Sequence, residues 1–189
     1  GYMVGALTLI SKSLMNNSQF DIVSFVIDHM AYKIARFVEE KLLKGESSKV
    51  DGLSKAKNVV TAKADSTITA DELIDLQGTV KDAFQQNAVW IMSSKTRTAL
   101  RKLKDQNGRY LLQDDATSAF GNMLLGKPVY VSDNMEDIGA SKTVIYYGDM
   151  SGLAVKVTEE MEVQVLREKY ATQHAVGVVA WMEFDAKIE

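Results

Sequence analysis

The hydrophobic residues between Phe20 and Phe37 recur at alternating spacings of three and four positions. This spacing places an apolar stripe on one side of an α-helix, which we expect to span Ser18 to Lys44. Ser18 and Asp21 form a capping-box pattern at its start, and Gly45 follows two lysines at its end. A coiled coil is the alternative, but phenylalanine and methionine on the stripe favour a helix that lies across a sheet.

The next hundred residues alternate between helical and strand patterns. Residues 46–68 are rich in serine, lysine and aspartate and have no sustained period, which predicts a connecting loop or a domain crossover. The pattern then predicts helices at 69–84 and 93–104 and strands at 88–92, 128–132 and 143–147. Residues 69–150 therefore form one expected α+β unit.

The C-terminal part is rich in β-forming residues. Alternating runs at 153–157, 162–166 and 175–184 predict an antiparallel meander with one solvated face. The long helix would pack on this meander if the chain leaves a first domain and later returns to it. The sequence therefore predicts an α+β body with two discontinuous domains.

Composition narrows the class of protein. The chain has 189 residues, 46% of them hydrophobic, with one proline and no cysteine, which is typical of an ordered globular protein without disulfides or thiolate metal sites. The net charge of −3 gives no general attraction to nucleic acid or anionic lipid. Residues 20–38 are apolar but carry five charged or titratable side chains, so we expect no membrane partner.

One stretch comes close to a nucleotide-binding motif. Gly121 to Lys127 matches a phosphate-binding loop, but Pro128 then lacks the hydroxyl that would bind magnesium. The stretch also leads into an expected strand, where the motif requires a helix. We therefore expect no nucleotide site here.

No other set of residues predicts catalysis or metal binding. His29 and His174 are interpreted as structural or surface histidines, because a metal site would also need two carboxylates. The acidic residues at 114–115 and 133–137 lack the ligand spacing of a calcium loop. We expect no catalytic, cofactor-binding or metal-binding residues and no small-molecule substrate, so the protein is not expected to be an enzyme.

The segment "LRKLKDQNGRYLL", residues 100–112, is the strongest candidate for a nucleic-acid site. Its cations and Tyr110 could contact phosphates and stack on a base. On a helix, however, Leu100 and Leu103 would face inward and the cations outward, which favours a solvated helix face. We interpret the turn around Gly108 as a helix exit and not as a hairpin.

This segment, followed by "FGNMLLGKPVYVSDNM" and a β-rich tail, resembles the major capsid protein family of tailed bacteriophages, the Hong Kong 97 fold. The matching pattern is Leu103, Lys104, Asp105, Gly108, Arg109 and Tyr110, then Leu125, Gly126, Pro128 and Val129. The resemblance implies a peripheral (P) domain of residues 1–49 and 151–189, in which a long spine helix packs on an antiparallel β meander. It implies an axial (A) domain for residues 50–150.

The resemblance implies a structural subunit of a phage or prophage icosahedral capsid, which assembles with copies of itself into capsomers. Encapsidated DNA would be contacted only non-specifically, no cofactor would be needed, and the protein would lie in the virion capsid after assembly in the bacterial host cytoplasm. An encapsulin-like bacterial compartment shell is the alternative within this fold. A small nucleic-acid-binding module is the alternative outside it.

The sequence departs from the family pattern in ways that lead to further expectations. It shows neither the N-terminal arm nor the extended loop of the family, so we expect a fragment of a longer chain that is unable to close a shell. Because that loop carries the cross-linking lysine in some relatives, we also expect no cross-linking. If residues 166–170 form the tip of the P-domain meander, Arg167, Glu168 and Lys169 are the expected interface residues.

Overall fold

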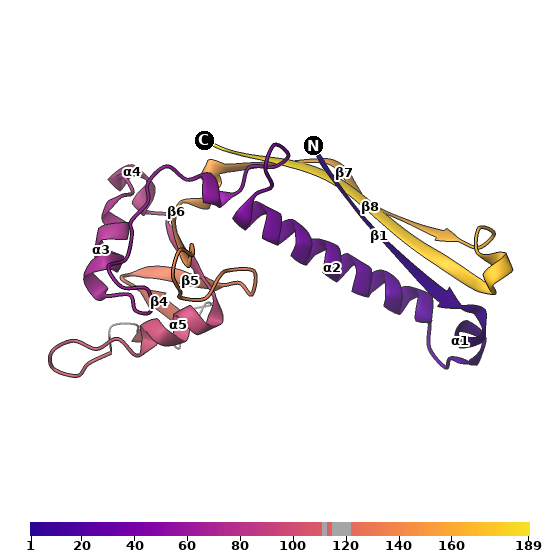
Figure 1. The fold of residues 1–189 in the computed structure, drawn as a ribbon, viewed down its shortest axis with the longest axis horizontal. Coiled ribbons are helices and arrows are strands. Elements are labelled where there is room, and N and C mark those ends of the chain that lie inside the picture. Colours follow the sequence, from indigo (N-terminus) through magenta and orange to yellow (C-terminus); the bar gives the residue numbers. More distant parts are fainter. Residues whose placement is uncertain (111–112, 115–121) are drawn as a thin grey trace. The chain divides into compact units, whose positions relative to one another are not determined.

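The computed structural model describes residues 1–110, 113–114 and 122–189. The chain divides into two compact units (Figure 1). Unit 1 comprises Gly1–Gly52 and Ala154–Lys187, and unit 2 comprises Leu53–Leu153 and Ile188–Glu189. The chain therefore leaves the first unit and later returns to it.

Unit 1 is built on a three-stranded antiparallel sheet in the order β1-β8-β7. The strands are β1 (Tyr2–Ser11), β7 (Leu153–Leu166) and β8 (Ala175–Ile188). Strand β1 pairs with β8 in a register that runs from Tyr2 opposite Phe184 to Ser11 opposite Ala175. The predicted fold class and antiparallel sheet are confirmed.

The strand pattern of the C-terminal part was predicted incorrectly in one respect. Runs 153–157 and 162–166 belong to a single strand, β7, and the third strand of the sheet is β1. Residues 158–160 are polar and exposed, so they interrupt the hydrophobic run without interrupting the backbone pairing. An edge strand can carry such residues because part of its surface faces solvent.

Two helices accompany this sheet, α1 (Lys12–Asn17) and α2 (Ile22–Lys44). Asp21 caps α2 by accepting hydrogen bonds from the N–H groups of Val23 and Ser24, so the helix begins later than the predicted Ser18. Ser18 instead ends α1, a helix that the sequence pattern did not predict. Gly45, at φ +75°, ends α2 as predicted.

Helix α2 packs along the sheet of unit 1, as its apolar stripe predicted. Met30 and Ile34 are buried on it. The Tyr2 ring of β1 is stacked on Phe37 of α2 at 6.0 Å between centroids and meets Phe184 of β8 edge-on at 5.9 Å. The core of unit 1 therefore lies between α2 and one face of the sheet, where alternate residues of β8 from Val176 to Ala186 are mostly buried.

Unit 2 is an α+β unit with a five-stranded mixed sheet in the order β3-β4-β5-β2-β6. Strand β2 pairs in parallel with β5, and the other pairs are antiparallel. The strands are β2 (Val89–Met92), β3 (Gln113–Asp114), β4 (Asn122–Leu124), β5 (Lys127–Val131) and β6 (Ile145–Gly148). The helices are α3 (Ala70–Gly78), α4 (Asp82–Gln85) and α5 (Ser94–Arg101).

The core of unit 2 forms around Trp90, which is fully buried and donates its indole N–H to the carbonyl of Leu124 at 2.9 Å. Leu73 from α3 and Leu100 from α5 belong to the same buried cluster. The two helices are thereby fixed to one hydrophobic core. Burial of these side chains is the main favourable term for the unit.

Two helix predictions in unit 2 need correction. The predicted helix 69–84 is divided into α3 and α4 after Gly78, a residue with low helix propensity. Helix α5 ends at Arg101 and not at Lys104. Residues 104–110 form a tight turn closed by an antiparallel bridge between Lys104 and Tyr110, so the turn at Gly108 is of hairpin type.

Candidate subunit interface

The predicted interface residues lie in the connection between β7 and β8. Arg167, Glu168 and Lys169 directly follow β7 and are all exposed. Tyr170 anchors this connection, because its ring lies over Gly177 of β8, where a Cβ atom would approach the ring to 2.5 Å. The tip therefore presents three neighbouring charges on a fixed base.

Unit 1 also exposes large hydrophobic side chains on the sheet face that points away from its buried one. Met3, Leu7 and Leu9 of β1 are 60%, 53% and 47% exposed. Trp181 of β8 is 45% exposed and lies over Gly5, its partner in the β1-β8 register. Neighbouring apolar side chains of this size on a protein surface are typical of a contact with another molecule.

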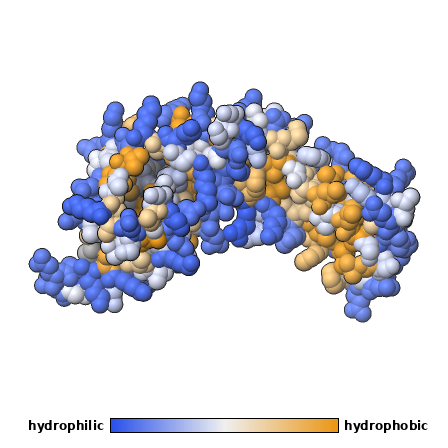
Figure 2. Space-filling model, in the orientation of Figure 1, coloured by the Kyte–Doolittle hydropathy of each residue, from blue (hydrophilic) through white to orange (hydrophobic). Residues whose placement is uncertain are grey.

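Helix α2 carries a second row of exposed rings on its outward side. Phe25 is 63% exposed and is stacked on His29 at 6.5 Å, and Tyr32 is 53% exposed beneath the guanidinium of Arg36. Figure 2 shows hydrophobic residues on the surface near α1 and the beginning of α2. His29 is thus a surface histidine, as predicted.

In unit 2, the first residues of α5 are engaged in local contacts. Lys95 forms an ion pair with Asp137 at 2.9 Å, and the Ser93 hydroxyl donates to the same carboxylate at 2.8 Å. The ammonium of Lys95 and the hydroxyl of Ser93 lower the pKa of Asp137, which in turn raises the pKa of Lys95. Asp137 therefore ties the start of α5 to the loop after β5.

The motif that resembled a phosphate-binding loop is a hairpin where the structure describes it. Leu125 and Gly126 have φ values of +49° and +78° and turn β4 into β5. Gly121 lies outside the described residues. The described part of the motif continues into strand β5 and not into a helix, as the strand pattern at 128–132 predicted.

In the part of the chain that the structure describes, no group of three or more His, Cys, Asp or Glu side chains could hold a metal ion. None of the helices described is both long enough and apolar enough to cross a membrane.

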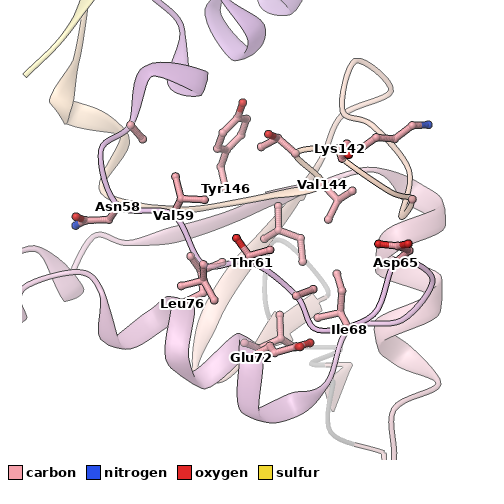
Figure 3. Close-up of a pocket in the computed structure, with 18 of the residues that line it drawn as sticks. Asn58, Val59, Thr61, Asp65, Ile68, Glu72, Leu76, Lys142, Val144 and Tyr146 are labelled. Atoms are coloured by element: carbon pink, nitrogen blue, oxygen red, sulfur yellow. The ribbon is translucent and has the colours of Figure 1, made fainter.

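Sequence reasoning did not predict a pocket of about 360 Å³ in unit 2 (Figure 3). It lies between residues 54–65, α3 and residues 139–146. Tyr146 lines the pocket, and burial raises the pKa of its hydroxyl. Glu72, which also lines the pocket, connects α3 to the preceding loop by accepting hydrogen bonds from the N–H groups of Lys63 and Thr69. The pocket was not predicted because one of its walls, residues 54–65, comes from a segment without sequence periodicity.

Comparison with solved structures finds the same fold in capsid, phage and encapsulin structures. The capsid of an empty GTA particle matches with a TM-score of 0.83 and 25% identity over 99% of this chain and 69% of that chain. A structure from Microbacterium phage Oxtober96 matches with a TM-score of 0.75 and 17% identity over 99% of this chain and 66% of that one. The holo-SrpI encapsulin complex from Synechococcus elongatus PCC 7942 matches with a TM-score of 0.69 and 13% identity over 99% and 69%.

A search of curated protein sequences finds no match. The sequence does match the family described as the phage capsid family, and the match extends over residues 1–189. The fold shared with the GTA particle capsid agrees with this match. The chain therefore belongs to the phage capsid family.

Proposed function

We propose that this chain is a structural subunit of a phage or prophage icosahedral capsid that assembles with its own copies into capsomers and encloses DNA. The observation that carries the proposal is the family match over all 189 residues. The fold shared with the GTA particle capsid, at 25% identity, supports it. The protein lies in the virion capsid, and its assembly takes place in the cytoplasm of the bacterial host.

Within this function, unit 1 is the peripheral domain and α2 its spine helix, whereas unit 2 is the axial domain. The bounds of the two compact units lie within a few residues of the ranges 1–49 with 151–189 and 50–150. The packing of α2 along β1 and β8 supports the spine-helix assignment.

A shell protein acts through its surfaces and needs no catalytic site. The exposed Met3, Leu7 and Trp181 support this mode of action, because they leave an apolar face of the sheet that a neighbouring copy can cover. Copies of the chain are thus its main partners. DNA inside the shell is contacted only non-specifically.

Negative-stain electron microscopy of the full gene product tests the proposal. We expect uniform icosahedral particles, because capsid interfaces repeat with closed symmetry. Soluble monomers under all conditions of concentration and salt would contradict the proposed function.

Charge reversal at the tip between β7 and β8 tests whether copies of the chain meet there. We expect Glu168→Lys in the full-length protein to lower particle yield by about tenfold, since like charges juxtaposed in an interface are unfavourable. The circular dichroism spectrum and the melting temperature should be unchanged, because Glu168 is exposed. Glu159→Lys is the matched control, as it reverses an exposed glutamate of β7 away from the tip. Equal yields for the two variants would remove Glu168 from the interface.

The encapsulin-like shell is the alternative that a specific observation favours, namely the fold shared with the SrpI complex. The content of purified particles separates the two functions. DNA inside the particles, with portal and terminase genes beside the gene, indicates a capsid. An enclosed enzyme encoded beside the gene indicates a compartment shell.

A further inference from the structure

Unit 2 carries a basic turn, which we define as residues 101–110. Lys104 and Tyr110 close it through an antiparallel bridge, and the carboxylate of Asp105 accepts hydrogen bonds from the N–H groups of Asn107 and Arg109, both at 2.8 Å. Gly108, at φ +77°, completes the bend. The turn is thus held by its own contacts, and Leu103 at its base packs against the core of unit 2.

The basic turn presents cations and one aromatic ring to solvent. Arg101, Lys102, Lys104 and Arg109 are exposed, and Tyr110 is 58% exposed with the ammonium of Lys104 at 4.8 Å from its ring centroid. Asp105 is the single acidic residue among them. This concentration of positive charge occurs in a chain whose net charge is −3. Such a surface attracts an anionic partner.

The same unit offers a surface of opposite charge on α3. Asp71, Ile74 and Asp75 follow one another at the spacing that places them on one side of a helix, and we call them the acidic face. Both aspartates are exposed and Ile74 is 53% exposed, whereas Leu73 is buried in the core. Among the described residues, no ion pair neutralises Asp71 or Asp75.

We propose that the basic turn of one copy docks on the acidic face of the next copy, head to tail, within a capsomer. This inference rests on the proposed function. Two different patches of opposite charge on one unit are what a heterologous contact requires, and repeating that contact by rotation closes a ring. The turn supplies charge for the aspartates and an exposed tyrosine for the exposed Ile74, so polar and apolar groups match on the two sides.

A nucleic acid is the competing partner for the basic turn. The acidic face lies on the same unit and the whole chain is negative, so a polyanion would be repelled by much of the remaining surface. A second copy carries a net charge of only −3 and offers its acidic face at the point of contact. The charge distribution therefore favours protein over DNA.

Charge reversal in the full-length protein tests the contact. We expect the turn variant, Lys102→Glu with Arg109→Glu, to lower particle yield by about tenfold when expressed alone. The face variant, Asp71→Lys with Asp75→Lys, should do the same. Lys55→Glu with Lys57→Glu is the control, since it reverses two exposed lysines of unit 2 outside the turn and should leave the yield unchanged.

Co-expression of the two variants identifies the head-to-tail geometry. The negative turn of the turn variant then meets the positive face of the face variant. The native basic turn of the face variant meets the native acidic face of the turn variant. If the two variants alternate around a six-membered ring, every contact is attractive. We expect the variant that combines all four changes to regain most of the particle yield, and the mixture to regain part of it, because the two variants cannot alternate throughout a five-membered ring. Normal melting temperatures of the variants would show that lost assembly is not lost folding.

Several outcomes would overturn the inference. Wild-type yield from either variant alone, or no recovery in both the mixture and the combined variant, would exclude the contact. Empty particles at normal yield with reduced DNA content in the turn variant would assign the turn to nucleic acid. If the wild-type protein itself forms no particles, it is the proposed function that fails.

Discussion

At the scale of single residues, two glycines show how closely the backbone packs where α2 ends. Gly45 takes φ +75° and donates its N–H to the carbonyl of Lys41 at 2.8 Å. A Cβ atom on Gly52 would lie 2.3 Å from the backbone nitrogen of Gly45. Gly45 could be predicted from the preceding lysines, but Gly52 could not, because its constraint comes from a residue seven positions away.

We expect Gly52→Ala to lower the free energy of unfolding by about 1–3 kcal/mol, since backbone atoms cannot move aside as a flexible side chain can. Gly78→Ala is the control. Gly78 is the last residue of α3, and no atom lies within 4 Å of a Cβ added there. The alanine should therefore raise the free energy of unfolding by about 0.5–1 kcal/mol. Urea denaturation of both variants measures the difference, and equal effects would contradict the close approach.

Glu72 offers a second test at the residue scale. Its carboxylate accepts the N–H groups of Lys63 at 2.8 Å and Thr69 at 2.9 Å, and these hydrogen bonds lower its pKa below the usual value. Because the folded-state pKa is lowered, the stabilising contribution is complete above the ordinary carboxyl pKa of about 4.3 and is lost as the pH falls below it. The loop before α3 should therefore open first in acid.

In Glu72→Gln, only one of the two side-chain atoms can accept, so one backbone N–H loses its partner. We expect amide hydrogen exchange at Lys63 or Thr69 to accelerate about tenfold at neutral pH, with much less dependence on pH between 5 and 3 than in the wild type. Exchange of buried amides in β2 is the internal control. Unchanged protection at Lys63 and Thr69 would refute the role of the carboxylate.

At the scale of elements, the sequence predicted most helices and strands but not all their limits. The apolar stripe on α2 is a local pattern, and it appears in the structure. Helix α3 begins with another local pattern, a capping box formed by Thr69 and Glu72. The continuity of β7 and the hairpin turn after α5 depend on pairing with distant or irregular backbone, which periodicity does not report. For the core of unit 2, the sequence predicted the strands and helices that contribute to it, but not which of their side chains pack together.

The two sides of α2 should respond differently to truncation. We expect Ile34→Ala to lower the free energy of unfolding by about 2–5 kcal/mol, because Ile34 is buried against the sheet. Tyr32→Ala, on the outward side, should cost below about 1 kcal/mol, since it loses a surface contact with Arg36. Chemical denaturation checks both values, and a large effect of Tyr32→Ala would show that this side is covered even in the isolated chain.

At the scale of the whole molecule, the chain consists of two units with separate cores. Each unit contains one tryptophan: Trp90 is fully buried in unit 2, whereas Trp181 lies on the surface of unit 1. The candidate interface at the tip of β7 and β8 could be proposed from a family resemblance. The exposed faces of β1 and α2 could not be predicted, because the sequence does not tell which side of an element is left uncovered in the folded unit.

We expect the units to unfold in separate steps, since multi-domain chains commonly depart from two-state behaviour. In Trp181→Phe, fluorescence reports unit 2 through Trp90 alone, whereas far-ultraviolet circular dichroism reports both units. The two probes should give different midpoints in urea. Coincident transitions would show that the units unfold as one cooperative body.

The pairing of β1 with β8 has a consequence for biosynthesis. Tyr2 leaves the ribosome early, but its partner Phe184 follows only after 181 intervening residues, which takes on the order of ten seconds or more at typical translation rates. Unit 2 is almost entirely synthesised within that interval and can fold first. The sheet of unit 1 is completed only after β8 has been synthesised, so the exposed faces of β1 and β8 form after unit 2 can fold.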